Sequence, residues 1–233
     1  SNSGKWIAFQ IGKTSFVDVP QLAIMPLNGS EKDIIILPFD RNKGSITWSS
    51  DDQYLYFTSP SNGGTVLNRT NISTKKTTTL SSFETGIAAY ALAGNKILSA
   101  RVQVSNPCEL YSTDALYKNE QQLSSFNDWV KTKKLSYPTK QSFKNSQGMT
   151  VEYWVMKPTN YQQGNKYPLL LEIHGKPSAM WGPGEASMWH EYQYFCSKGY
   201  GIVYSNPRGS GGYGADFLKA NIKDWGTGPA SDV

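Results

Sequence analysis

A pattern of short β-strands recurs three times in the first half of the chain, and this repeat limits the choice of fold more than any other feature. Each copy is expected to begin with a polar turn and a strand, at residues 3–9, 51–57 and 94–100. Two further strands are expected in each copy: at 21–24 and 33–37 in the first, at 66–69 and 76–80 in the second, and at 109–111 and 120–123 in the third. Equivalent positions lie 42 to 48 residues apart. A period of about 40–50 residues with several short strands is typical of β-propeller blades.

Propeller blades stabilise one another, because one small sheet cannot bury both of its faces alone. A closed propeller needs at least about four blades, and this chain offers three copies of the pattern. The sequence therefore predicts the blades of an incomplete β-propeller over residues 1–135.

The second half of the chain changes to alternating strands and helices. Strands are expected at 150–156, 168–173 and 200–205, and helices at 185–198 and 216–221. The first strand alternates in polarity after a turn, which favours an edge hairpin. The second is apolar throughout, as in a strand buried on both faces, and Gly199 is expected to end the first helix in the left-handed conformation. This order predicts a parallel α/β sheet over residues 136–233, with the domain boundary in the charged segment 131–138.

The composition excludes several classes of protein. Hydrophobic residues make up 38% of the 233 residues and charged residues 18%, which excludes intrinsic disorder. The longest apolar runs are far shorter than the roughly 20 residues that span a membrane. The net charge of +5 forms no continuous basic stripe, so no nucleic-acid partner is expected. Only two cysteines, Cys108 and Cys196, are present and no CxxC pair, so we expect free thiols, no metal site and no cofactor.

The segment 172–177 ends the apolar strand with His174 and Gly175. Loops at the carboxyl ends of parallel strands are where active sites form. A His-Gly turn at this place can direct backbone N–H groups, here those of Gly175 and Lys176, at a reacting carbonyl oxygen. The His174 side chain itself is expected to be hydrogen-bonded and structural.

A second candidate motif is the glycine-rich segment 209–214, which matches the GxGxxG pattern of a dinucleotide-binding loop between a strand and a helix. Asn206, Pro207 and Arg208 separate the strand from the first glycine, so the turn is not the tight one that such loops have. The ribose-binding acid is also missing unless Asp232 takes its place. Nucleotide binding stays a third alternative.

Several motifs belong together: Trp48-Ser49-Ser50-Asp51-Asp52, Asn106-Pro107-Cys108-Glu109-Leu110-Tyr111, His174-Gly175-Lys176-Pro177, Asn206-Pro207-Arg208-Gly209-Ser210 and Asp224-Trp225-Gly226. They resemble the prolyl oligopeptidase family of serine peptidases, closest to its acylaminoacyl-peptidase and dipeptidyl-aminopeptidase branch. The resemblance implies that residues 1–135 are the last blades of a β-propeller and 136–233 the N-terminal part of an α/β-hydrolase peptidase domain. It also implies a serine exopeptidase acting on oligopeptides by acyl transfer, with Gly175 and Lys176 supplying the oxyanion backbone.

The chain departs from the family pattern in two places. Lys176 stands where the family usually has a second glycine, and no serine has glycine at both −2 and +2, so the nucleophile motif GxSxG is absent. In α/β hydrolases the catalytic Asp and His follow the nucleophile along the chain. All three residues are therefore expected beyond Val233, and the chain is expected to be a fragment without catalytic residues that is inactive alone.

Glu185, Arg208 and Tyr213 lie on loops at the same end of the expected sheet and are candidates for the rim of the substrate pocket. A structural role is the alternative, in which Glu185 caps its helix and Arg208 pairs with it. The competing function is a non-catalytic β-propeller binding module with a vestigial hydrolase tail. Formation of a homo-oligomer by the full-length protein stays open, and so does its localisation, whether cytoplasmic, periplasmic or secreted.

Overall fold

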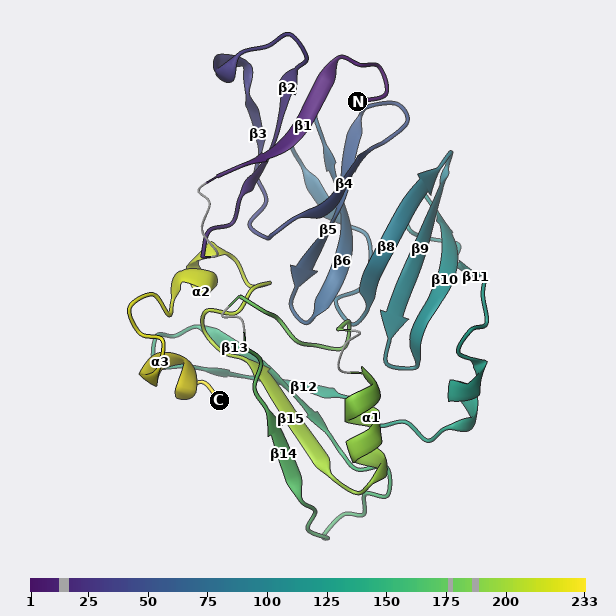
Figure 1. Ribbon diagram of the computed structural model, residues 1–233, viewed down its shortest axis with the longest axis vertical. Coiled ribbons are helices and arrows are strands. Elements are labelled where there is room, and N and C mark those ends of the chain that lie inside the picture. Colours follow the sequence, from purple (N-terminus) through teal and green to yellow (C-terminus); the bar gives the residue numbers. More distant parts are fainter. Residues whose placement is uncertain (13–16, 176–177, 186–188) are drawn as a thin grey trace.

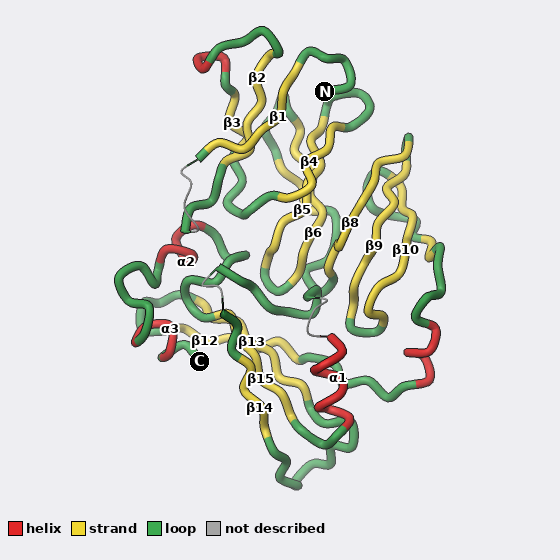
Figure 2. The backbone as a smooth tube through the Cα atoms, viewed as in Figure 1, coloured by secondary structure: helices red, strands yellow, loops and turns green. Residues whose placement is uncertain are grey.

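The computed structural model describes residues 1–12, 17–175, 178–185 and 189–233 and consists mainly of β-strands arranged in three sheets (Figures 1 and 2). Helices are short and lie mainly in the last quarter of the chain. None of the helices in these ranges is long and apolar enough to cross a membrane.

The first sheet contains three antiparallel strands in the order β1 (Trp6–Ile11), β2 (Gln21–Pro26) and β3 (Ile35–Leu37). A short 3-10 turn, Glu31–Asp33, precedes β3. Leu22 and Leu37 are fully buried, and they pack in one cluster with Leu55 and Phe57 of the neighbouring sheet. The first sheet is therefore stabilised by its neighbour, as expected for a sheet too small to form its own core.

The second sheet is larger and consists of two antiparallel units. Its strands are β4 (Gly44–Trp48), β5 (Tyr54–Ser61), β6 (Gly64–Asn71), β7 (Thr77–Thr79), β8 (Gly86–Ala93), β9 (Lys96–Gln103), β10 (Asn106–Asp114) and β11 (Gln121–Gln122). Within each unit neighbouring strands pair antiparallel, and the units are joined by one parallel position, Thr65 with Gly86. The predicted three-strand repeat is confirmed, and β4 and β8 are additional strands that were not predicted.

The third sheet follows the order β12 (Thr139–Lys144), β13 (Thr150–Met156), β15 (Gly201–Asn206), β14 (Leu169–Glu172). The predicted hairpin at the edge is the antiparallel pair β12–β13, and the predicted neighbours β14 and β15 are parallel. Because β13 also pairs antiparallel with β15, the sheet is mixed, and the prediction of a parallel sheet was wrong in this respect. Moreover, β14 is the other edge strand, and Leu169 and Leu171 are 62% and 50% exposed. Its burial on both faces was predicted wrongly, because Leu169 and Leu171 share one face of the strand and this face is left exposed in the part of the chain that the structure describes.

Three α-helices accompany this sheet: α1 (Trp189–Ser197), α2 (Ala215–Lys219) and α3 (Thr227–Ala230). A further 3-10 segment, Asp128–Thr132, lies before β12. Gly199 follows α1 with φ = +93°, so the predicted left-handed helix end is confirmed. Residues 186–188 of the predicted helix lie outside the described ranges. The core under α1 contains a stack of Trp154, Tyr204 and Tyr192, with ring centroids 5.5 and 4.9 Å apart.

The loop 178–185 packs directly against the second sheet. A Cβ atom on Gly182 would overlap with the backbone of Gly63 in the β5–β6 turn, and one on Gly86 would overlap with the carbonyl of Gly184. The amide of Gly184 also donates to the carbonyl of Gly63 at 3.1 Å. Glycines are therefore required here by close approach of two backbones. The contact holds the third sheet against one end of β5, β6 and β8 (Figure 1).

Candidate active site

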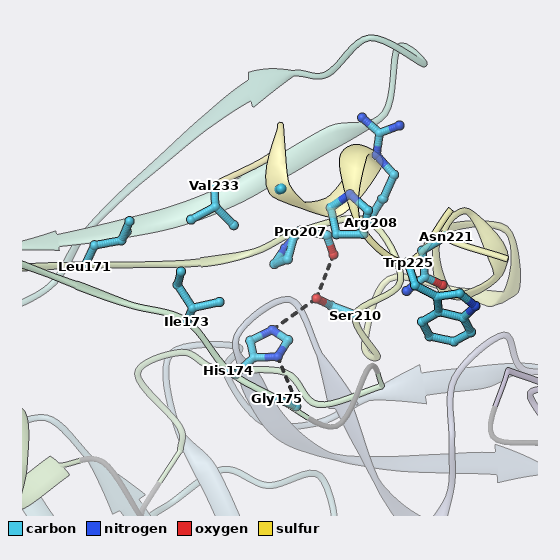
Figure 3. A pocket seen from close by; sticks show the side chains of 13 residues that line it. Leu171, Ile173, His174, Gly175, Pro207, Arg208, Ser210, Asn221, Trp225 and Val233 are labelled. Atoms are coloured by element: carbon cyan, nitrogen blue, oxygen red, sulfur yellow. Dashed lines mark hydrogen bonds between the residues drawn. The ribbon is translucent and has the colours of Figure 1, made fainter. Parts of the chain in front are cut away.

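The candidate site lies where the parallel strands β14 and β15 end side by side (Figure 3). A cavity of about 660 Å³ opens there. Its walls come from the end of β14, from the loop after β15 and from the last thirteen residues: Leu171, Ile173, His174, Gly175, Pro207, Arg208, Ser210, Asn221, Trp225, Gly226, Pro229, Ala230 and Val233. The carboxyl ends of parallel strands are a common place for ligand-binding sites, and most of these side chains are apolar.

His174 connects the loops that follow the two strands. Its Nε2 atom lies 3.1 Å from the Ser210 hydroxyl, and its Nδ1 atom lies 3.2 Å from the carbonyl oxygen of Gly175. The ring also packs edge-on against Trp181 at 5.5 Å. Burial lowers the pKa of His174, which favours the neutral ring. These contacts fix the start of the turn at Gly175.

The Ser210–His174 pair has the composition of a nucleophile and its base, but the surroundings do not activate it. An activated serine needs a base that a third group orients, usually a carboxylate on the other ring nitrogen. Here Nδ1 faces the backbone carbonyl of Gly175. Ser210 is only 1% exposed, and two acceptors compete for its single hydroxyl proton, the Pro207 carbonyl at 2.7 Å and, when Nδ1 carries the ring proton, Nε2 of His174 at 3.1 Å. The pair therefore positions the two loops.

Gly175 is exposed, and a Cβ atom placed on it would contact nothing within 4 Å. The predicted oxyanion turn thus begins beside open space at the mouth of the cavity. Lys176, the other residue of that prediction, lies outside the described residues together with Pro177. The oxyanion role of both residues stays a prediction.

Arg208 is held in a buried ion pair with Asp232. The two side chains are 3% and 0% exposed, and two guanidinium nitrogens donate to the carboxylate at 2.9 and 2.7 Å. The Arg208 amide adds a third bond at 2.8 Å. Burial alone would raise the pKa of Asp232, but these hydrogen bonds outweigh it and hold the pKa below its usual value. The partner of Arg208 is thus Asp232 and not Glu185, which corrects the predicted structural alternative.

Tyr213 and Glu185 do not line this cavity. The Tyr213 hydroxyl donates to Glu152 on β13 and accepts from the Asn206 side chain, both at 2.9 Å. Burial raises the pKa of Tyr213. Glu185 lies in the loop before α1, beside Trp189 and Tyr192. Of the three predicted rim residues, only Arg208 contributes to the cavity wall, and its charge is neutralised by Asp232.

The glycine-rich loop 209–214 packs against the protein itself. The amides of Gly209 and Gly211 donate to the carbonyls of Phe217 and Ala179, at 2.8 and 3.1 Å. A Cβ atom on Gly212 would overlap with the Met180 side chain. The following helix, α2, has only five residues. These glycines are explained by close packing, and the arrangement gives no support to the nucleotide-binding alternative.

Asn206, Ser210 and Asp232 are site residues whose contacts were not predicted. Asn206 is fully buried, and its amide bonds to both the N–H and the carbonyl of Trp181, at 2.8 and 2.7 Å. A polar residue at the end of a buried apolar strand is a signal that could have identified Asn206. Asp232 lies 24 residues from Arg208 in sequence, and no local pattern indicates that pairing.

Comparisons with known proteins agree with these features. A model described as the prolyl oligopeptidase family matches residues 186–233. The uncharacterized peptidase YuxL of Bacillus subtilis is 40% identical over 128 residues, which are 54% of this chain and 19% of that protein. Dipeptidyl-peptidase 5 of Aspergillus fumigatus is 26% identical over 239 residues, covering 100% of this chain and 33% of its own length.

A solved structure of Pyrococcus horikoshii acylaminoacyl peptidase superposes with a TM-score of 0.79 at 25% identity, over 97% of this chain and 34% of that one. The chain thus spans about a third or less of the length of the proteins that it matches. The family match over residues 186–233, the peptidase relatives and the shared fold lead to one conclusion: the chain resembles members of the prolyl oligopeptidase family.

Proposed function

We propose that the full-length protein is a serine exopeptidase that removes dipeptides or acylated residues from the N-terminus of oligopeptides. In this proposal residues 1–135 are the last blades of a β-propeller, and residues 136–233 begin the α/β-hydrolase domain. The repeated antiparallel units β1–β3, β4–β7 and β8–β11 support the first assignment. The sheet β12–β15, with its cavity at the carboxyl ends of β14 and β15, supports the second.

The observation that carries the proposal is the position of the His174–Gly175 turn at the end of β14, at the mouth of the cavity. In the reaction, a serine oxygen attacks the carbonyl carbon of the scissile peptide, and the carbonyl oxygen becomes an oxyanion. The Gly175–Lys176 turn would donate a backbone N–H to that oxyanion. The catalytic His takes the serine proton and gives it to the leaving amine as the carbon–nitrogen bond breaks, and water then releases the acyl group from the serine.

The nucleophile of this reaction is proposed to lie outside the 233 residues. No serine of the chain stands in a GxSxG sequence, and Ser210 is buried without an activated base. The catalytic Asp and His follow the nucleophile in α/β hydrolases, so they are assigned to the same missing part. This chain then contributes the oxyanion turn and its supporting loops.

The proposal is tested by comparing the full-length protein with the 233-residue chain on dipeptidyl and N-acetylaminoacyl p-nitroanilides. We expect the full-length protein to hydrolyse at least one of the two classes, and a serine-directed phosphonate to abolish the reaction. The 233-residue chain should give no turnover above the buffer rate, because it lacks nucleophile and base. Full-length protein that folds but hydrolyses neither class would instead favour a binding module. Turnover by the chain alone would disprove the assignment of the nucleophile.

A further inference from the structure

A second cavity, of about 370 Å³, lies between the two units of the larger sheet. The cavity lies beside the last residues of β4 and the first residues of β5 and β9. This is the end of the larger sheet that faces away from the sheet β12–β15 (Figure 1). Its wall includes aromatic and aliphatic side chains as well as charged ones: Trp48, Tyr54, Tyr56, Arg69, Lys96 and Ile97. The cavity is therefore separate from the candidate active site at the carboxyl ends of β14 and β15.

Arg69 is the half-buried charged group of this cavity. Its guanidinium packs over the Tyr54 ring, with Cζ 4.6 Å from the centroid, and Nη1 donates to the carbonyl of Ala115 at 3.3 Å. Its Nε atom is fully buried and has no hydrogen-bond partner. Among the described residues no carboxylate lies within ion-pair distance of Arg69. Within the described ranges, the guanidinium thus has one hydrogen-bond acceptor, the carbonyl of Ala115.

In the described part of the chain, two other charged groups line the cavity, Asp51 and Lys96, and the negative charge of Asp51 forms no ion pair with Arg69. The Asp51 carboxylate accepts from the Ser49 hydroxyl at 2.6 Å and from the Gln53 amide at 3.0 Å. Lys96 is exposed at the wall and adds a second positive charge. By contrast, Arg101 in the same sheet is paired with Glu120 through two guanidinium nitrogens. A half-buried guanidinium without a counter-ion is a favourable partner for an anion, because the two can form charge-assisted hydrogen bonds.

We propose that this cavity binds a carboxylate that carries an apolar substituent. Arg69 would hold the carboxylate by charge-assisted hydrogen bonds, which are stronger than neutral ones, and Lys96 would add long-range attraction. The walls formed by Tyr56 and Ile97 would contact the apolar group. The volume suits one or two amino-acid residues. A free acyl amino acid and the C-terminal residue of a short peptide both have this chemistry.

The test is calorimetric titration of the full-length protein, treated beforehand with a serine-directed phosphonate so that the proposed active site is blocked. The ligands are N-acetyl-phenylalanine, its neutral amide, and a tripeptide with a free or amidated C-terminus. We expect both acids to bind and each amide to bind about 10- to 100-fold more weakly, the usual effect of losing a charge-assisted hydrogen bond. If only N-acetyl-phenylalanine binds, the natural ligand is a free acyl amino acid. If only the tripeptide acid binds, the ligand is the C-terminal residue of a peptide.

The variant Arg69→Met should weaken acid binding by a similar factor without lowering the melting temperature, since it removes an unpaired charge. The matched control is Arg101→Met, which breaks an ion pair outside the cavity. It should lower the melting temperature and leave the affinity unchanged. Equal affinities for acid and amide, an unchanged affinity in Arg69→Met, or no saturable binding at millimolar concentrations would overturn the proposal. The result does not depend on peptidase activity.

Discussion

Replacing Asp232 by Asn is expected to lower the free energy of unfolding of the chain by about 3–5 kcal/mol at neutral pH, because it leaves the Arg208 charge buried and unpaired. Both side chains are almost completely buried, and Asp232 accepts from the amide, Nε and Nη2 of Arg208. The pair also ties the segment after β15 to the end of the described chain, so its loss should loosen the cavity wall. Urea unfolding followed by tryptophan fluorescence measures the change.

The effect should depend on pH in one direction. Because the pKa of Asp232 is lowered in the folded state, the stabilisation is complete above the ordinary Asp pKa of about 3.9. It is lost as the pH falls through the lower folded-state pKa. The difference in unfolding free energy between the wild type and Asp232→Asn should therefore be constant from about pH 8 to 5 and shrink below about pH 4.

The matched control is Asp216→Asn, an exposed carboxylate in the first turn of α2, which should change the stability by no more than about 0.5 kcal/mol. A second variant that combines Arg208→Met with Asp232→Leu removes both charges and should recover part of the loss. Equal destabilisation by Asp232→Asn and Asp216→Asn would show that the buried pair does not hold this region.

Replacing Lys176 by Pro is expected to lower kcat of the full-length enzyme by about 10²–10³, the usual cost of removing one oxyanion donor. Proline has no backbone N–H, so the variant deletes the donor that the proposed function assigns to this turn. KM should change much less, because the hydrogen bond is strongest in the transition state. Steady-state kinetics on a p-nitroanilide substrate provides the measurement.

Lys176→Gly serves as the control, since glycine keeps the N–H and is the residue that the family usually has here. It should retain kcat to within a few-fold of the wild type. Melting temperatures of both variants separate loss of the donor from loss of the fold. If Lys176→Pro and Lys176→Gly reduced kcat equally while both remained folded, the N–H of residue 176 would not be the donor.

The strands that could be predicted from the sequence are those whose apolar residues repeat at a fixed spacing. Leu22, Leu67 and Leu110 lie 45 and 43 residues apart, and the three strands that contain them pair as predicted. The parallel pair β14–β15 was also predictable, because both segments are apolar runs separated by a helix.

Two strands, β8 and β4, were not predicted from the sequence. β8 reads Gly-Ile-Ala-Ala-Tyr-Ala-Leu-Ala, which has no strong preference for a strand. Its neighbours β9 and β6 decide its conformation. β4 contains Gly44 and Ser45, and a register shift interrupts its pairing with β5. For β8, tertiary packing determines the conformation and no local pattern indicates it. β4 is short, but residues 45–48 alternate in polarity, which is a signal that could have identified it.

The candidate site was predictable only in its location. A turn at His174–Gly175 after an apolar strand indicated the carboxyl end of a pair of parallel strands, and the cavity lies there. The contacts that hold the site join residues far apart in sequence. Ser210 lies 36 residues from His174, and Tyr213 lies 61 residues from Glu152. Such pairings depend on the folded topology, and the structural alternative considered from the sequence therefore paired Arg208 with Glu185 instead of Asp232.

The measurement that tests the proposed function most directly is labelling of the full-length protein with a fluorophosphonate, followed by peptide mapping in a mass spectrometer. We expect a single adduct on a serine that lies outside the 233 residues and within a GxSxG sequence, and no adduct on the 233-residue chain alone. Ser210 should stay unlabelled, because it is buried and its base has no orienting carboxylate. An adduct on Ser210, or peptide hydrolysis by a protein that forms no adduct, would contradict the assignment of this chain to a serine peptidase with its nucleophile elsewhere.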